Sequence, residues 1–63
     1  MMSLLEFNQK NVVLTDTDGK QYSGIANFID KYDLEETEDA IQIKVGNFWE
    51  IFYESDIKTI ELV

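Results

Sequence analysis

Hydrophobic and polar residues alternate along most of this chain, which is the pattern of β-strands with one buried face. Five stretches of the chain have the pattern of a strand. One is β-branched, two alternate, one is apolar throughout and one is rich in isoleucine. They cover residues 11–15, 20–29, 40–45, 48–53 and 57–63. Five short strands joined by polar turns favour an all-β fold, in which a strongly bent antiparallel sheet closes into a small barrel.

The second predicted strand is the longest and contains a glycine. Its residues fall on two faces, one with Tyr22, Gly24, Ala26 and Phe28, and the other with Ser23, Ile25, Asn27 and Ile29. Glycine inside a strand weakens it and often marks a sharp bend. We therefore expect this strand to bend at Gly24.

Polar segments connect the predicted strands. Residues 16–19 have turn chemistry, and Gly19 is free to take a positive φ. Residues 33–39 hold five carboxylates in seven residues, which favours a loop because paired strands would crowd like charges. Residues 54–56 form a tight corner before the last strand, in which Ile60 and Leu62 share a face.

Gly46-Asn47 is a hairpin signal between two apolar strands. A two-residue loop at this position fixes which residues face each other. It places Val45 opposite Phe48, Ile43 opposite Glu50, and Ile41 opposite Phe52.

The first residues predict either one helical turn or a short strand. Ser3 has the chemistry of a helix cap, with Glu6 three residues later. Leu4, Leu5 and Phe7 supply one apolar side. The doubled methionine at residues 1–2 reads as an ambiguous start and supports no interpretation.

The fourth predicted strand is apolar on both faces. Phe48 and Phe52 lie on one face and Trp49, Ile51 and Tyr53 on the other. Either all of these side chains fold into one core, or a neighbouring subunit covers the second face. A barrel of this size has little interior, which favours the subunit interface. The predicted interface residues are Trp49, Ile51, Tyr53, Ile57 and Thr59.

Composition narrows the classes of function. The chain has 63 residues, enough for a single domain, residues 1–63, and it contains no cysteine, histidine or proline. Disulfides, ordinary zinc sites and thiol or imidazole catalysis are therefore excluded. A chain this small rarely forms a cleft that could hold paired carboxylates. We expect no enzyme activity and no cofactor. Because disulfides and zinc are excluded, self-association is the most favoured way for a domain with so small a core to gain stability.

The formal charge of −8 comes from thirteen carboxylates against five lysines, with no arginine. Nucleic-acid binding depends on basic side chains that neutralise phosphates, so this balance disfavours RNA. It also opposes anionic membrane surfaces and favours basic protein partners or cations. The sequence shows no membrane-spanning run and no signal pattern, so the default is a soluble cytoplasmic protein.

Two motifs occur in the order and at the spacing of a known family. The run of residues 18–24 joins an Asp-Gly turn to Tyr22 and Gly24, and is followed by Ala26, Ile29 and Asp30 at the expected offsets. Residues 52–61 join a hydrophobic strand, a polar corner and a terminal strand. Over residues 11–63 the chain resembles the Sm/Lsm family of small, SH3-like β-barrels, as a divergent bacterial- or phage-type member.

The resemblance implies a short N-terminal helix, a five-stranded bent sheet, and a ring built by pairing the fourth strand of one subunit with the fifth of the next. It also implies uridine-rich RNA at the ring pore. Tyr32 matches the base-stacking aromatic of the family. At three other positions the family's amide, arginine and glycine are replaced by Leu34, Tyr53 and Glu54. The candidates for base contact are therefore Tyr32, Lys31 and Tyr53, whose aromatic ring could stack although it cannot replace the arginine.

Two carboxylate-rich segments have other candidate roles. Residues 16–20 resemble the opening of a calcium loop, but Lys20 stands where an oxygen ligand belongs, and a hairpin turn explains them better. An acidic cluster could hold a hard cation weakly, meet a basic protein, or simply be solvated. Its members are Asp30, Asp33, Glu35, Glu36, Glu38 and Asp39.

Three functions follow in order of preference. The first is a non-catalytic Sm-like ring that acts as a scaffold or protein-interaction module. The second is an RNA- or nucleotide-binding Sm-like protein with a stacking site at Tyr32. The third is a monomeric SH3-like barrel that binds peptides on its aromatic surface.

Overall fold

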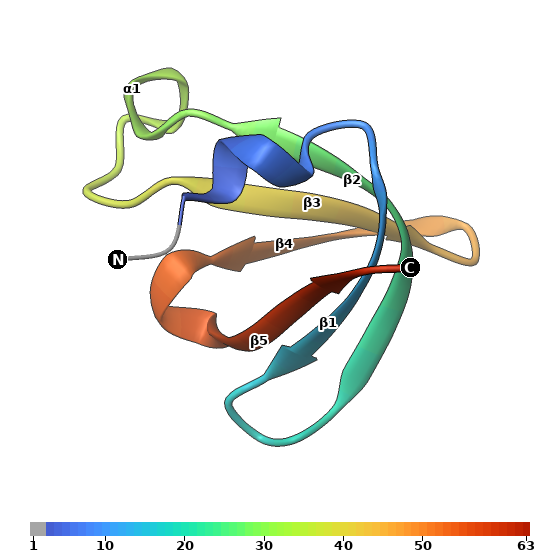
Figure 1. Cartoon of the computed structure of the whole chain (residues 1–63). Coiled ribbons are helices and arrows are strands. Elements are labelled where there is room, and N and C mark those ends of the chain that lie inside the picture. The colour runs from blue at the N-terminus through green and yellow to red at the C-terminus, as the bar shows by residue number, and fades with distance from the viewer. Residues whose placement is uncertain (1–2) are drawn as a thin grey trace.

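The computed structural model describes residues 3–63, and Met1 and Met2 lie outside the described residues. Five antiparallel strands form one sheet in the order β4-β3-β2-β1-β5, which curls into a small barrel (Figure 1). The elements are η1 (Leu4–Phe7), β1 (Asn11–Asp16), β2 (Gln21–Ile29), α1 (Lys31–Leu34), β3 (Ala40–Val45), β4 (Phe48–Tyr53), η2 (Glu54–Asp56) and β5 (Ile57–Leu62). The predicted all-β fold is confirmed, and the five strands begin and end within one residue of their predicted positions.

The curvature of the barrel is concentrated in β2. Its first half pairs with β1, up to Ile25 opposite Asn11, and its second half pairs with β3, from Ala26 opposite Ile43. Gly24, at the change of partner, has φ +151°, and a Cβ there would lie 3.2 Å from Cγ2 of Ile43. Figure 1 shows β2 bending through this region. The predicted bend is present because only glycine allows both this backbone angle and this close approach.

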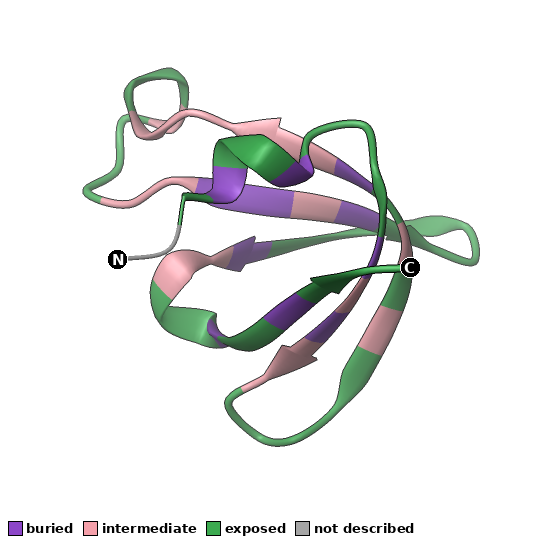
Figure 2. Ribbon diagram, in the orientation of Figure 1, coloured by how far each residue is buried: buried purple, intermediate pink, exposed green. Residues whose placement is uncertain are grey.

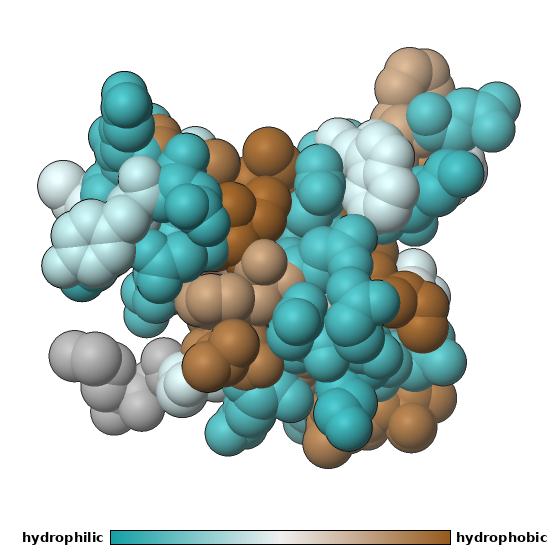
Figure 3. Space-filling model, turned by 90° about the horizontal axis from the view of Figure 1, so that it is seen from above, coloured by the Kyte–Doolittle hydropathy of each residue, from teal (hydrophilic) through white to brown (hydrophobic). Residues whose placement is uncertain are grey.

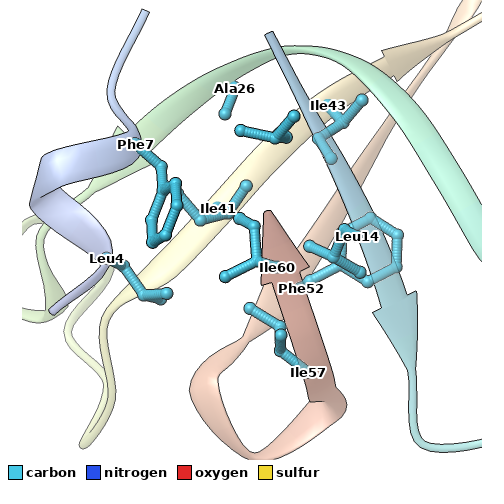
Figure 4. Close-up of a cluster of buried hydrophobic side chains, with 10 residues drawn as sticks. Leu4, Phe7, Leu14, Ala26, Ile41, Ile43, Phe52, Ile57 and Ile60 are labelled. Carbon is cyan, nitrogen blue, oxygen red and sulfur yellow. The ribbon is translucent and has the colours of Figure 1, made fainter. Parts of the chain in front are cut away.

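The core lies inside the curved sheet (Figure 2). Alternate residues of the strands point inward, and η1 adds two side chains at one end (Figure 4). The buried cluster consists of Leu4, Phe7, Val12, Leu14, Ala26, Ile41, Ile43, Phe52, Ile57 and Ile60. The rings of Tyr22 and Phe52 pack across the interior at 4.8 Å between centroids, which joins β2 to β4 although these strands are not neighbours in the sheet.

The N-terminal segment is a turn of 3₁₀-helix rather than a strand. In this helix, residues three apart share a side, so Leu4 and Phe7 are buried while Leu5 is 59% exposed. The expectation that Leu5 joins the apolar side is therefore wrong. Ser3 is the N-cap residue, but its side chain makes no capping hydrogen bond.

The β3–β4 hairpin has the predicted register. Val45 pairs with Phe48, Ile43 with Glu50, and Ile41 with Phe52. Gly46 takes φ +62° in the connecting turn, which suits glycine far better than other residues.

The predicted loop over residues 33–39 starts too early, because Asp33 belongs to the one-turn helix α1. The side chain of Asp30 caps α1 by accepting a hydrogen bond from the backbone N–H of Tyr32 at 2.8 Å. Glu35 then ends the helix in the left-handed conformation, with φ 55°. The loop proper runs from Glu35 to the start of β3.

Replacement of Gly24 tests the bend in β2. We expect Gly24→Ala to lower the free energy of unfolding by about 1–3 kcal/mol, because the residue is forced into an unfavourable φ. Urea denaturation followed by circular dichroism measures the change. Ser23→Ala, an exposed position on the same strand, is the control and should change stability by less than about 0.5 kcal/mol. Equal stability of the two variants would contradict this account of the bend.

Candidate functional site

An exposed apolar surface lies on β4. Its residues are Phe48, Trp49 and Ile51, which are 74%, 50% and 41% exposed; we call them the β4 surface. Figure 3 shows that hydrophobic residues reach the outside of the molecule between groups of hydrophilic ones. A small protein that leaves a tryptophan and a phenylalanine uncovered has a candidate interaction surface there.

The pairing of β4 with β3 explains why Trp49 and Ile51 are exposed. Trp49 lies opposite Lys44 and Ile51 opposite Gln42, on the outer face of the sheet. Phe52 lies opposite Ile41 on the inner face and is 6% exposed. The strand is therefore apolar on both faces, and its outer face remains partly exposed at Trp49 and Ile51.

Phe48 is exposed for a different reason. It shares the inner face with Phe52, but it stands beside the Gly46-Asn47 turn, opposite Val45. Figure 1 shows that this turn projects beyond the rest of the barrel. Phe48 is not one of the predicted interface residues, although its position next to the Gly46-Asn47 turn indicates that it lies at the end of the hairpin.

The sheet has two free edges, and they face the same side of the barrel. In residues 3–63, β4 pairs only with β3, β5 pairs only with β1, and no ladder of hydrogen bonds joins β4 to β5. The barrel is thus open between these strands (Figure 1). A free edge presents unpaired backbone N–H and C=O groups that can pair with another chain.

The five predicted interface residues have different environments. Trp49 and Ile51 belong to the β4 surface, Thr59 is exposed on β5, and Tyr53 is half-buried at the end of β4. Ile57 is only 8% exposed, so its side chain belongs to the core. The β1–β5 ladder contains a register shift that places Ile57 opposite Asp16. Residues three apart in a regular strand lie on opposite faces, but the shift breaks this alternation, so both Ile57 and Ile60 are buried.

The candidate stacking residues are only partly brought together. Tyr32 lies on α1 and is 80% exposed, with Nζ of Lys31 5.5 Å from the centre of its ring. Tyr53 belongs to β4, a separate element. Asp39 connects the two regions: its side chain accepts from the N–H of Lys31 at 2.9 Å, and its carbonyl accepts from the N–H of Glu54 at 3.2 Å.

Several carboxylates of the acidic cluster hold backbone N–H groups. Asp30 caps α1, and Asp39 accepts from Lys31. Glu38 accepts from the backbone N–H of Ser55 at 2.7 Å and from its hydroxyl at 3.0 Å. Outside the cluster, the side chain of Glu54 accepts from the N–H of Asp39 at 3.3 Å. The bonds of Glu38 and Glu54 tie the loop before β3 to the corner before β5, a connection that the charge pattern of the sequence does not predict.

The calcium-like turn is a hairpin turn. One side-chain oxygen of Asp16 accepts from the N–H groups of Asp18 at 3.0 Å and Lys20 at 2.9 Å. The backbone of Asp16 also bonds to Lys20 and Gly19. Within the described part of the chain, no group of three or more carboxylates is arranged to hold a metal ion.

No pocket opens on the surface of residues 3–63. None of these residues forms a helix that is long and apolar enough to cross a membrane. The β4 surface and the two free edges form a broad, shallow area on which another molecule can pack.

The chain matches no protein-family model, and no curated protein or solved structure is significantly similar to it.

Removal of one carboxylate distinguishes a structural role of the acidic cluster from simple solvation. Asp39→Ala should lower the free energy of unfolding by about 1–2 kcal/mol, because the partly buried N–H of Lys31 loses its acceptor. Chemical denaturation measures the change. Asp33→Ala removes the same charge from an exposed side chain and should change stability by less than about 0.5 kcal/mol. If the two variants are equally stable, the hydrogen bond from Lys31 to Asp39 does not stabilise the fold.

Proposed function

We propose that this protein is a non-catalytic, Sm-like barrel that assembles with copies of itself into a ring and acts in the cytoplasm as a scaffold or protein-interaction module. The observation that carries the proposal is the β4 surface beside two free edges. Strand pairing between copies satisfies the free backbone groups and covers apolar side chains in the same step.

Three further features support this proposal. The five-stranded antiparallel sheet, the 3₁₀ turn before β1 and the tight corner before β5 agree with what the Sm/Lsm resemblance implies. The core of a 63-residue chain is small, so burial between subunits adds stability that the single chain lacks. The acidic cluster keeps such an assembly highly charged and soluble, and offers its outside to basic partners.

A mass measurement tests assembly directly. Light scattering at micromolar concentration should give a mass that is a multiple of the chain mass. Replacement of both Trp49 and Ile51 by serine removes the outer apolar part of the β4 surface and should weaken association at least about tenfold, or about 1.4 kcal/mol. The control is Leu5→Ser, which removes an exposed apolar side chain from η1 instead of β4. A wild-type monomer at this concentration would rule out the ring and leave the monomeric peptide-binding barrel as the better proposal.

RNA binding is the second candidate function, and the exposure of Tyr32 favours it. The side chain of Tyr32 is 80% exposed, and the ammonium group of Lys31 lies over its aromatic ring. An exposed aromatic side chain of this kind is suited to stacking on an unpaired base. The three carboxylates Asp30, Asp33 and Glu35 lie within three residues of Tyr32 and oppose phosphate binding.

Titration of a labelled oligouridine at low salt tests this second function, because phosphate contacts are strongest there. If Tyr32 stacks on a base, Tyr32→Ala should weaken binding by about 1–3 kcal/mol, which is about 5- to 150-fold. Tyr32→Phe keeps the stacking ring and should bind as the wild type does. Absence of binding at low salt rejects the RNA function.

A further inference from the structure

The outer face of the sheet is apolar in one half only. The β3–β4 ladder runs without a register shift, so alternate residues of both strands point away from the core. These residues are Ala40, Gln42 and Lys44 on β3, opposite Tyr53, Ile51 and Trp49 on β4; we call them the β3–β4 outer face. On the outer face of β1, by contrast, Thr15 lies between Gln21 and Thr59. That polar row suits water, whereas a face with Trp49 and Ile51 suits a covering layer.

Pairing of the free edges does not supply this layer. A strand added to an edge extends the sheet in its own plane, so an outward side chain gains a neighbour beside it but none above it. Sheets bury an apolar face by packing against a second layer about 10 Å away. The uncovered part lies at Lys44, Trp49 and Ile51, which are exposed, while Tyr53 is half-buried and Ala40 is buried.

The two ends of the β3–β4 outer face differ in charge. At one end the strands meet carboxylates: Asp30 follows β2, Asp39 precedes β3, and Glu54 follows β4. Each of these carboxylates accepts a hydrogen bond from a backbone N–H, which holds it in place. α1 and the loop after it add four further carboxylates and one lysine. The other end, residues 44–49, holds Lys44 and no carboxylate.

A second copy of the chain can cover this face in two symmetric ways. In both, two identical faces stack, with a two-fold axis between them. If the axis runs along the strands, the carboxylate ends of the two copies lie together and repel. If it runs across the strands, through Gln42 and Ile51, the carboxylate end of each copy lies over Lys44 of the other. Trp49 of each copy then stacks over Tyr53 of the other, and the two Ile51 side chains meet.

We propose that two copies of this protein stack through their β3–β4 outer faces, with the strands antiparallel and Lys44 of each copy beside the carboxylate end of the other. Both copies use the same surface, so the contact closes at two, whereas head-to-tail pairing of edges continues into a ring. This inference goes beyond the proposed ring. It needs neither free edge, because β3 is an interior strand and β4 contributes side chains rather than backbone groups.

Reversal of the charge at Lys44 tests the contact. Lys44→Glu should raise the dissociation constant of the stacked pair at least about tenfold, because two attractions in each dimer become repulsions. Lys44 is exposed and lies away from both free edges, so the variant should fold and its edges should be unchanged. Sedimentation velocity over a concentration series measures mass and dissociation constant, and circular dichroism confirms the fold.

Lys20→Glu is the matched control. It makes the same change in net charge at an exposed residue of the turn before β2, outside the β3–β4 outer face. Association should stay within about twofold of wild type, because distant exposed charges are largely screened. If both variants weaken association alike, net charge determines it and the proposed contact is wrong.

Crosslinking at the two-fold axis tests the geometry independently, because the chain contains no cysteine. A residue on the axis meets its own copy, so one substitution is enough. Gln42→Cys should give covalent dimers with a bis-maleimide that spans about 10 Å, the distance between stacked sheets. Ser23→Cys, on the outer face of the polar half, is exposed and should crosslink far more slowly. Equal crosslinking of the two variants would contradict the stacked arrangement.

The outcomes separate this contact from the ring. If the wild type associates, Lys44→Glu associates equally well and Gln42→Cys shows no preference, the stacked contact is overturned while association through the edges stands. A wild type that stops at two copies and is dissociated by Lys44→Glu supports the stacked contact and rejects the ring. A wild type that stays monomeric over the whole concentration series rejects both.

Discussion

The close approach of β2 to β3 at Gly24 is the constraint on which the rest of the fold depends. One strand pairs with β1 through its first half and with β3 through its second half, so its bend determines how the two halves of the sheet face each other. The bend allows Phe52 of β4 to reach Tyr22 of β2 across the interior. It also brings β4 and β5 to the same open side. The core and the free edges are therefore two results of one backbone geometry.

The acidic character of the chain has a structural explanation. Asp16, Asp30, Asp39 and Glu54 each accept a hydrogen bond from a backbone N–H group in a turn or at a corner. Hydrogen bonds to an ionised acceptor are stronger than bonds between neutral groups, and they fix connections that contain no proline. The carboxylates thus collect at the loops, while the outer face of the β3–β4 hairpin carries Lys44 beside Trp49 and remains free of acidic side chains.

The sequence predicts the strands and the β3–β4 register well, because alternation and the Gly46-Asn47 turn are local signals that agree with each other. It predicts less well where non-local packing decides. The burial of Ile57 depends on a register shift against β1, a strand more than forty residues earlier. The exposure of Leu5 depends on a 3₁₀ rather than an α-helical turn. For the candidate site, the two-faced pattern identifies Trp49 and Ile51, whereas the exposure of Phe48 depends on how far the hairpin extends beyond the barrel.

The pairing of β1 with β5 has a consequence for the order of folding. Val12 pairs with Leu62, which lies 50 residues later, whereas β2, β3 and β4 pair with their neighbours along the chain. Contacts between distant residues form late because closing a long loop costs more entropy. The β2–β4 meander can therefore form while one edge of β1 is still unpaired. During that interval β1, with Val12 and Leu14 uncovered, is the segment most prone to pair with another unfolded chain.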